Sequence, residues 1–373
     1  MNSQEKPGLY LHIPFCRSKC SYCGFYSIAS TSLLHRWLDA LKKEMTLYRD
    51  RFGSFDSIYV GGGTPSLLDT RDLTTIIDYI FANFSFSHDI EITIEANPCD
   101  LTRGKISELK NLGFNRVSVG VQSFNDRILS FLGRKHSADD SERAFTLLRE
   151  NGFENIGMDL IYGFKGMSMD HWSDTLYRCL TFQPEHVSCY QLTFERHTLF
   201  NRFKQKGLIT PLSEDEECSY FMATSRVLSD NGYIHYEISN FARDEIYTSR
   251  HNRKYWHHIP YLGLGPSAHS FQGSNRWWNV RSIRNYCDAL ESGRAPIEGC
   301  ENLTHQQLRL ESISLGARTR EGIDLEAISH DLQSTQRLTG LQDAGFLHVE
   351  NGRVVPTTKG FLVADHLPLY LFD

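Results

Sequence analysis

The sequence lacks the features that would place it in a membrane, outside the cell or on nucleic acid. No run of about twenty apolar residues occurs, so no segment is expected to span a bilayer. The opening segment, MNSQEKPGLYLHIPF, has no apolar core of the kind found in signal peptides. There is no basic excess either, because the net charge is −6. The sequence therefore predicts a cytoplasmic protein without a nucleic-acid partner.

A disulfide framework is also missing. The chain has 9 cysteines, an odd number, and most of them are scattered singly. In a reducing compartment a close group of cysteines is more often metal-binding or catalytic. The rest of the composition is ordinary for a globular protein, with 40% hydrophobic and 23% charged residues. A length of 373 residues predicts one large domain with a small appendix.

The first half of the chain alternates short apolar runs with segments of helical periodicity. Such alternation predicts parallel strands joined by crossover helices. Six units are fewer than the eight of a closed barrel, so we expect an α/β fold built on a partial, open (β/α)6 barrel. A doubly wound open sheet is the alternative, since strand periodicity does not separate the two. The expected strands are 8–13, 57–62, 90–96, 116–121, 155–162 and 186–193.

Polar residues stand at the carboxyl ends of these expected strands, where α/β folds place their chemistry. The first strand runs into a cysteine group, and the second ends in GGGTPS (61–66). The later strands carry or end in Glu95, Gln122, Asp159, Gln191 and Thr193. Because the carboxyl ends of parallel strands meet at one edge, these residues predict a single site.

The cysteine group reads HIPFCRSKCSYC, with Cys16, Cys20 and Cys23 spaced C-x3-C-x2-C. A structural zinc ion takes four closed ligands, so a zinc site would need a distant His or Cys to complete it. A cubane iron–sulfur cluster takes one cysteine per iron. Three cysteines would then leave one iron free for an exogenous ligand. The remaining cysteines are expected to be core or surface thiols.

This spacing on a loop after the first strand resembles the signature of the radical S-adenosylmethionine (SAM) superfamily, over residues 8 to about 200. The resemblance implies a [4Fe-4S] cluster on Cys16, Cys20 and Cys23 whose fourth iron is chelated by SAM. Reduction of SAM by the cluster would then yield a 5′-deoxyadenosyl radical. The same resemblance implies a SAM shell of Tyr10, Tyr22, Gly62, Gly63, Thr64, Glu95, Gln122, Arg134 and Asp159. Taken singly, the glycines could form a plain strand-to-helix turn and the aromatics could be core residues.

Within the superfamily the chain is similar to the group formed by oxygen-independent coproporphyrinogen III oxidase (HemN) and the heme chaperone HemW. GGGTPS, IEANP, GVQSF, LGRKHS and DLIYG follow one another in the order of that group. The oxidases have an extra cysteine two residues after the third and an N-terminal extension. This chain has Phe25 there and begins its first expected strand near residue 8. Gly24, however, is the residue that the oxidases have, where the chaperones often have Asp.

The hexapeptide HNRKYW (251–256) matches the HNxxYW signature of the heme chaperones, to which the chain is most similar. The resemblance implies that His251, Tyr255 and Trp256 bind heme, with the imidazole as an axial iron ligand. A helix end packed into an interdomain seam is the alternative interpretation. Two adjacent histidines at 257–258 leave the identity of the iron ligand open.

The remaining sequence predicts a helix over 213–232 and a small carboxy-terminal unit. Ser213 is the expected N-cap of that helix, and Asn231-Gly232 its end. The carboxy-terminal unit reads helix, helix and a hairpin turning at Asn351-Gly352, which is similar to a winged helix. We expect the radical SAM barrel over 1–240, a connecting region with the heme motif over 241–300 and a HemN-type, winged-helix-like α+β domain over 301–373.

The resemblance implies a heme chaperone that binds heme and transfers it to acceptor hemoproteins such as respiratory-chain components, without turnover. The alternatives are radical oxidative decarboxylation of coproporphyrinogen III and another radical SAM reaction on a tetrapyrrole. Implied partners are heme, its acceptors and an electron donor such as flavodoxin or ferredoxin. A homodimer is the oligomer considered.

Overall fold

The computed structural model describes residues 6–328 and 332–372, and its centre is a curved sheet of 12 strands. Strands β1 to β6 are parallel and lie in sequence order. Each expected strand is present within four residues of its predicted bounds. The six are β1 (Gly8–Ile13), β2 (Phe55–Gly62), β3 (Phe86–Ala96), β4 (Arg116–Gln122), β5 (Ile156–Tyr162) and β6 (His186–Gln191).

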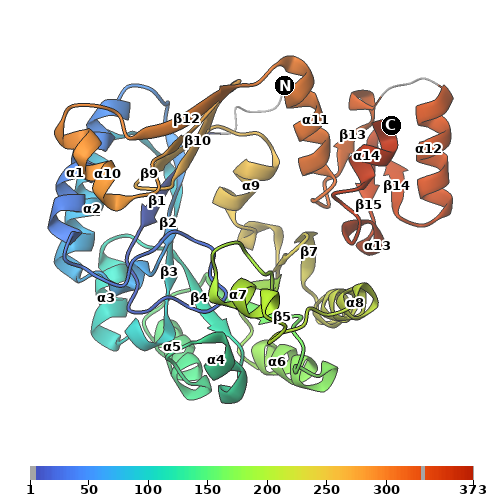
Figure 1. Cartoon of the computed structure of the whole chain (residues 1–373), viewed down its shortest axis with the longest axis horizontal. Coiled ribbons are helices and arrows are strands. Elements are labelled where there is room, and N and C mark those ends of the chain that lie inside the picture. Colours follow the sequence, from blue (N-terminus) through green and yellow to red (C-terminus); the bar gives the residue numbers. More distant parts are fainter. Residues whose placement is uncertain (1–5, 329–331, 373) are drawn as a thin grey trace.

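The parallel strands form a partial barrel that stays open. β1 and β6 do not pair with each other, because each has another strand on its outer edge. Sequential strand order with right-handed crossovers places the connecting helices on one face, which excludes a doubly wound sheet. These helices lie on the outside of the curved sheet (Figure 1). They are α1 (Leu34–Tyr48), α2 (Thr70–Asn83), α3 (Arg103–Asn111), α4 (Asp126–Leu132), α5 (Ala138–Glu150) and α6 (Met169–Thr181).

Short strands extend the sheet beyond both edges of the barrel. Beyond β1 the sheet continues with β9 (Tyr261–Leu264), β10 (His269–Gln272), β11 (Asn275–Asn279) and β12 (Ile297–Asn302). β9 runs parallel to β1, and the later strands in this series are antiparallel to their neighbours. Beside β6 lie β8 (Asn240–Ala242) and β7 (Ile234–Glu237). The helix α10 (Ile283–Glu291) packs on α1, and α9 (Arg250–Trp256) lies against β1 and β2. The edges are therefore covered by segments distant in the sequence (Figure 1).

The predicted helix near residue 213 is confirmed as α8 (Glu214–Asp230). Ser213 forms a capping box with Glu216, and the helix ends at Asn231 before Gly232, whose φ is +83°. The preceding helix, α7 (Leu199–Gln205), begins at the N-cap Thr198. Of the helices in the described residues, none is long and apolar enough to cross a membrane.

The carboxy-terminal unit has a small apolar core of its own, which includes Ile313, Leu347 and Leu371. The helices are α11 (His305–Gly316), α12 (Leu332–Asp343), α13 (Thr358–Phe361) and α14 (Leu367–Phe372). The strands are β13 (Ile323–Asp324), β14 (Leu347–Glu350) and β15 (Arg353–Pro356). The predicted hairpin joins β14 and β15, and both turn residues, Asn351 and Gly352, have positive φ, as a tight hairpin turn requires. Figure 1 shows this unit beside the barrel, next to α9 and α8.

Candidate functional site

A cavity of about 740 Å³ lies at the carboxyl ends of the barrel strands. It brings together eight of the nine residues predicted to surround SAM, namely Tyr22, Gly62, Gly63, Thr64, Glu95, Gln122, Arg134 and Asp159. Cys23 lines the same cavity, so the cysteine loop forms part of its wall. Cavities of this size accept cofactor-sized ligands.

The ninth predicted residue, Tyr10, does not line this cavity. Its side chain points into the barrel, where the hydroxyl donates to Nδ1 of His12 at 3.0 Å. The ring lies 6.2 Å from the ring of Tyr59. Tyr10, which is half-buried, thus lies inside the barrel and does not line the cavity.

The cysteine loop is held against the barrel by backbone and side-chain contacts. Cys16 N–H donates to the carbonyl of Ile28 at 3.0 Å, which closes the base of the loop. The Thr64 hydroxyl points at Sγ of Cys16 at 3.4 Å, and Nη1 of Arg134 points at Sγ of Cys20 at 3.6 Å. Both are donors, which suits sulfur atoms that carry negative charge when they bind metal.

The three cysteines are free thiols of intermediate exposure. A cubane puts each thiolate on a different iron, so the three sulfurs need not converge on one point. Burial raises the pKa of the Cys23 thiol to about 11, which means that this site disfavours a thiolate unless a cation is present. The donor set therefore fits a three-cysteine cluster.

Two glycines let the cysteine loop lie directly on the end of β2. Gly62 has a φ of +105°, and a Cβ there would come within 2.6 Å of Nδ1 of His12. A Cβ on Gly63 would lie 2.5 Å from the carbonyl oxygen of Phe15, closer than real Cβ atoms approach. The fold itself thus requires glycine at both positions, as the plain-turn interpretation holds, and their backbone also forms cavity wall.

Two carboxyl groups lie on the cavity floor. Glu95 accepts hydrogen bonds from the hydroxyl of Tyr59 at 2.9 Å and from the backbone N–H of Gly62 at 3.0 Å. Burial, reinforced by the charge of Asp159, raises the pKa of Glu95 to about 7. Burial also raises the pKa of Asp159, which accepts from the Ser118 hydroxyl. A cationic ligand would favour the ionised form of both groups, so the floor suits a ligand with positive charge.

Gln122 lines the cavity in an uncommon backbone conformation. Its backbone has a φ of +65°, an uncommon conformation for a residue other than glycine. Its Oε1 is buried and has no hydrogen-bond partner among the described residues, although Gln122 lines the cavity. A buried acceptor without a partner destabilises the protein unless a ligand or water satisfies it. The residues present therefore fit a polar cofactor such as SAM.

Sequence reasoning missed several cavity residues, because single polar side chains within strands give no signal of their own. Tyr59 and Ser118 lie inside β2 and β4, and Tyr190 lies in β6. The one available signal was the alternation of side chains along each strand, which indicates the residues that point into the barrel.

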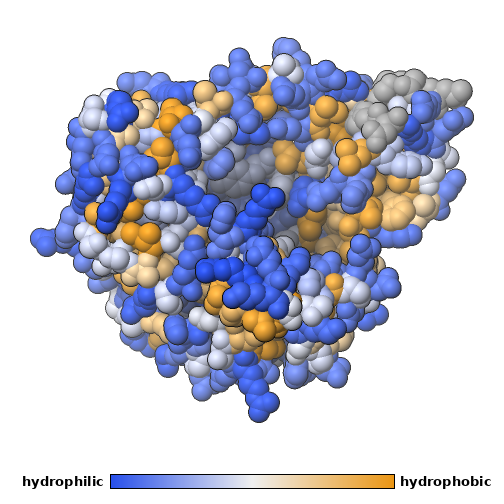
Figure 2. Space-filling view, in the orientation of Figure 1, coloured by the Kyte–Doolittle hydropathy of each residue, from blue (hydrophilic) through white to orange (hydrophobic). Residues whose placement is uncertain are grey.

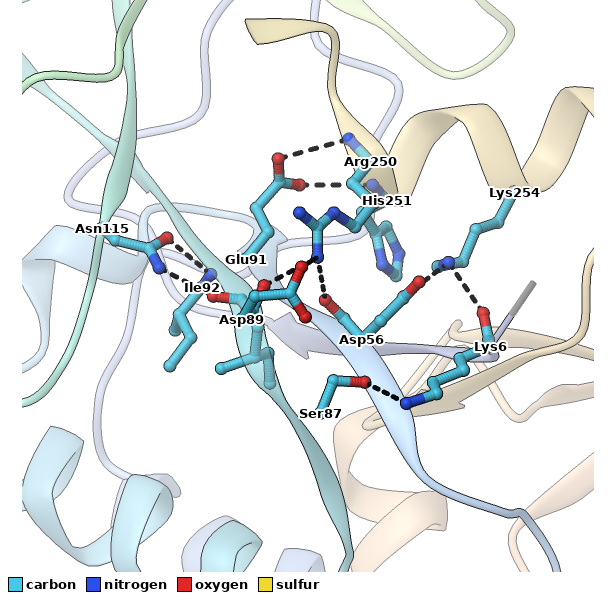
Figure 3. A network of polar contacts seen from close by, with 11 residues as sticks. Lys6, Asp56, Ser87, Asp89, Glu91, Ile92, Asn115, Arg250, His251 and Lys254 are labelled. Atoms are coloured by element: carbon cyan, nitrogen blue, oxygen red, sulfur yellow. Dashed lines mark hydrogen bonds and ion pairs between the residues drawn. The ribbon is translucent and has the colours of Figure 1, made fainter. Parts of the chain in front are cut away.

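The hexapeptide HNRKYW forms all of α9 except its first residue, Arg250, and this helix closes the amino-terminal end of the barrel. Figure 3 shows the His251 ring directed away from the Glu91 carboxylate and into the barrel. His251 is fully buried, with Nδ1 hydrogen-bonded to the Ser57 hydroxyl at 3.1 Å and Nε2 to the Tyr255 hydroxyl at 2.9 Å. Burial lowers the pKa of the imidazole to about 3, so the ring is neutral. Neither nitrogen is open to an iron atom.

Buried polar contacts pin α9 in this position (Figure 3). The Glu91 carboxylate accepts from the backbone N–H groups of Arg250 and His251, both at 3.2 Å. Lys254 is buried and pairs with Asp56 at 2.6 Å. Because breaking a buried ion pair costs roughly 3–5 kcal/mol, moving His251 out of the barrel would strongly destabilise the fold.

The other predicted heme residues lie differently. Trp256 has an indole nitrogen without a hydrogen-bond partner among the described residues, and Arg318 lies 5.4 Å from its ring. Tyr255 lines a second cavity, outside the barrel. Neither His251 nor Trp256 lines this second cavity.

The architecture and the cysteine loop have counterparts among known proteins. Residues 10–178 match the radical SAM superfamily and residues 303–363 match the HemN C-terminal domain. Heme chaperone HemW of Mycobacterium tuberculosis H37Rv is 33% identical over 364 residues, which is 96% of this chain and 93% of that protein. The chain belongs to the HemW family of radical SAM proteins. HemW of Bacillus subtilis strain 168 is 33% identical over 369 residues, 96% of this chain and 97% of the relative.

A solved structure extends the likeness to the fold. Coproporphyrinogen III oxidase (HemN) from Escherichia coli superposes with a TM-score of 0.84 at 24% sequence identity. The match covers 98% of this chain and 90% of HemN. HemW-family and HemN chains thus share one architecture, and the residues that differ between them have to carry any difference in function.

Proposed function

We propose that this protein is a heme chaperone that binds heme and transfers it to acceptor hemoproteins. The observation that carries the proposal is the similarity to heme chaperones along nearly the full length of both chains. The HNRKYW hexapeptide supports it, because this signature belongs to the chaperone group. Heme, its acceptors and an electron donor such as flavodoxin or ferredoxin are the proposed partners.

The cofactor set proposed for the protein is a [4Fe-4S] cluster with SAM. Cys16, Cys20 and Cys23 would hold three irons of the cluster, and the cavity at the strand ends would hold SAM. When bound, this pair supplies one-electron chemistry. Glu95 and Asp159 would offset the positive charge of SAM, and Gln122 would accept one of its hydrogen bonds. Thr64 and Arg134 would donate to the cluster thiolates.

Radical oxidative decarboxylation of coproporphyrinogen III is the second candidate. Gly24 favours it, because the oxidases carry glycine at this position. Phe25 opposes it, because the oxidases have cysteine there; the Phe25 side chain is 66% exposed at the cavity edge. The fold is compatible with both activities, so the two must be separated by assay.

The decisive experiment is an anaerobic heme titration of the cluster-loaded protein, followed by mixing the complex with an apo-hemoprotein. A chaperone should bind heme saturably and pass it to the acceptor, as read from the absorption spectrum. The same preparation, given SAM, a reductant and coproporphyrinogen III, should form no vinyl product. Absence of saturable heme binding together with porphyrinogen turnover would refute the proposal and support the oxidase.

A further inference from the structure

A second cavity lies outside the barrel, between the added strands β9–β11 and helix α11. Its volume is about 660 Å³, and Figure 2 shows this face of the molecule hollowed between the sheet and the carboxy-terminal unit. Its walls are mainly aromatic and histidine rings. The rings belong to Tyr255, His258, Tyr261, His269, Phe271 and Trp278. Flat rings around an open cleft of this size suit a planar apolar ligand.

His269 is the histidine of this cleft that is free to bind a metal. It lies on β10 directly opposite Trp278 on β11, and the two rings stack with centroids 5.9 Å apart. Neither of its nitrogens has a hydrogen-bond partner among the described residues. Burial and the nearby Arg276 lower the pKa of His269, which keeps the imidazole neutral, as iron coordination requires.

The other histidines near the cleft are engaged. His258 is hydrogen-bonded through Nε2 to Glu311 at 3.1 Å and through Nδ1 to the Ser312 hydroxyl at 3.1 Å. His251 is sealed inside the barrel with both nitrogens bonded. An iron ligand from either residue would first have to give up these bonds.

We propose that this cleft binds iron porphyrin and that His269 is the axial ligand. The inference rests on the proposed heme-binding function and names the site and the ligand for it. Trp278, stacked on His269, would stand edge-on to the macrocycle and hold the imidazole in place, and Phe271 would add an apolar contact from the same strand as His269. Tyr255 links the cleft to HNRKYW, because its ring packs against Tyr261 on the wall, with centroids 4.7 Å apart, while its hydroxyl bonds His251.

The charges in the cleft determine the orientation of the porphyrin. Arg276 is paired with Glu311 at 2.5 Å and lies 3.8 Å from Glu301. Because these two carboxylates already offset the charge of the Arg276 guanidinium, the cleft does not attract the carboxylates of the porphyrin. The apolar edge of the macrocycle therefore enters the cleft, and the carboxylate edge stays in solvent.

The test compares heme titrations of the full, cluster-loaded protein and its variants under anaerobic conditions. His269→Ala is expected to weaken heme binding at least tenfold and to remove the spectrum of histidine-ligated heme. Added imidazole should restore that spectrum. His88→Ala, at an exposed histidine of β3, is the matched control and should bind like the wild type. Metal-free protoporphyrin should bind the wild type and His269→Ala equally, because only the iron contact is lost.

The outcomes separate the ligand from the function. If His269→Ala binds heme with wild-type affinity and an unchanged spectrum, His269 is not the axial ligand, and the chaperone function still stands. No saturable heme binding by the wild type would overturn the chaperone function itself. His251→Ala is expected to keep the histidine-ligated spectrum. Loss of that spectrum in a variant that keeps both wild-type circular dichroism and wild-type SAM affinity would assign the ligand to His251 instead.

Discussion

Replacing Glu95 by glutamine is expected to weaken SAM binding and to abolish most of its pH dependence. SAM carries positive charge, which the Glu95 carboxylate attracts and its protonated form does not. With a pKa of about 7 in the free protein, Glu95 is mostly protonated at pH 6 and mostly ionised at pH 8. The dissociation constant of SAM should therefore fall by about tenfold over this range, because binding first requires loss of the proton.

Isothermal titration of the cluster-loaded protein at pH 6, 7 and 8 measures this effect. The contribution of Glu95 is the difference between wild type and Glu95→Gln in the slope of the logarithm of the SAM dissociation constant against pH. Titration of SAM itself is common to both proteins and cancels in this difference. Glu44→Gln is the control: burial also raises the pKa of Glu44 to about 7, but its carboxylate accepts from Tyr286 and Gly265, away from the cavity. It should keep the wild-type slope.

S-adenosylhomocysteine extends the test, because it keeps the ammonium group and lacks the charged sulfur. An equal slope for both ligands would place Glu95 next to the ammonium, and a slope for SAM alone would place it next to the sulfonium. A wild-type dissociation constant that changes less than twofold between pH 6 and 8 would refute the reasoning. So would a full slope in Glu95→Gln.

Three further substitutions test the cysteine loop and the fold. Gly63→Ala should lower the free energy of unfolding by about 1–3 kcal/mol in a denaturant titration, because its Cβ would meet the backbone of the loop, whereas Gly104→Ala has open space and should be neutral or stabilising. After cluster reconstitution, Cys16→Ser should lack the visible absorption of the cluster, and its bound iron should be lower by the iron content of one cluster. Cys99→Ser should keep both. Ser213→Ala removes one half of a capping box and should cost about 1 kcal/mol in the same unfolding assay.

The barrel could be predicted from the sequence because its strands are long apolar runs separated by amphipathic helices. The outer strands could not. β8 has three residues and β9 and β10 have four each, too few to show a period. They become strands because the open edges of β1 and β6 offer unpaired backbone groups, which is a tertiary effect.

The lining of the first cavity was predictable to the extent that its residues stand at strand ends, as Glu95 and Gln122 do. Tyr10 shows the limit of this reasoning, because a side chain within β1 is directed by the alternation of the strand and not by its distance from Cys16. The sequence left open whether His251 binds heme or packs into a seam, and it did not predict its place inside the barrel. That place depends on the partners of α9, Asp56 and Glu91, which are far away in the chain.

Helix α9 forms part of the wall of the second cavity and touches a residue that lines the first. His251 stacks on Tyr59, with centroids 5.3 Å apart, and the Tyr59 hydroxyl donates to Glu95 on the floor of the first cavity. One turn later Tyr255 bonds His251 and forms wall of the second. A substitution in HNRKYW is therefore expected to alter both cavities. Loss of heme binding in a His251 variant does not by itself identify the iron ligand; SAM affinity measured on the same variant tells whether the barrel floor has moved as well.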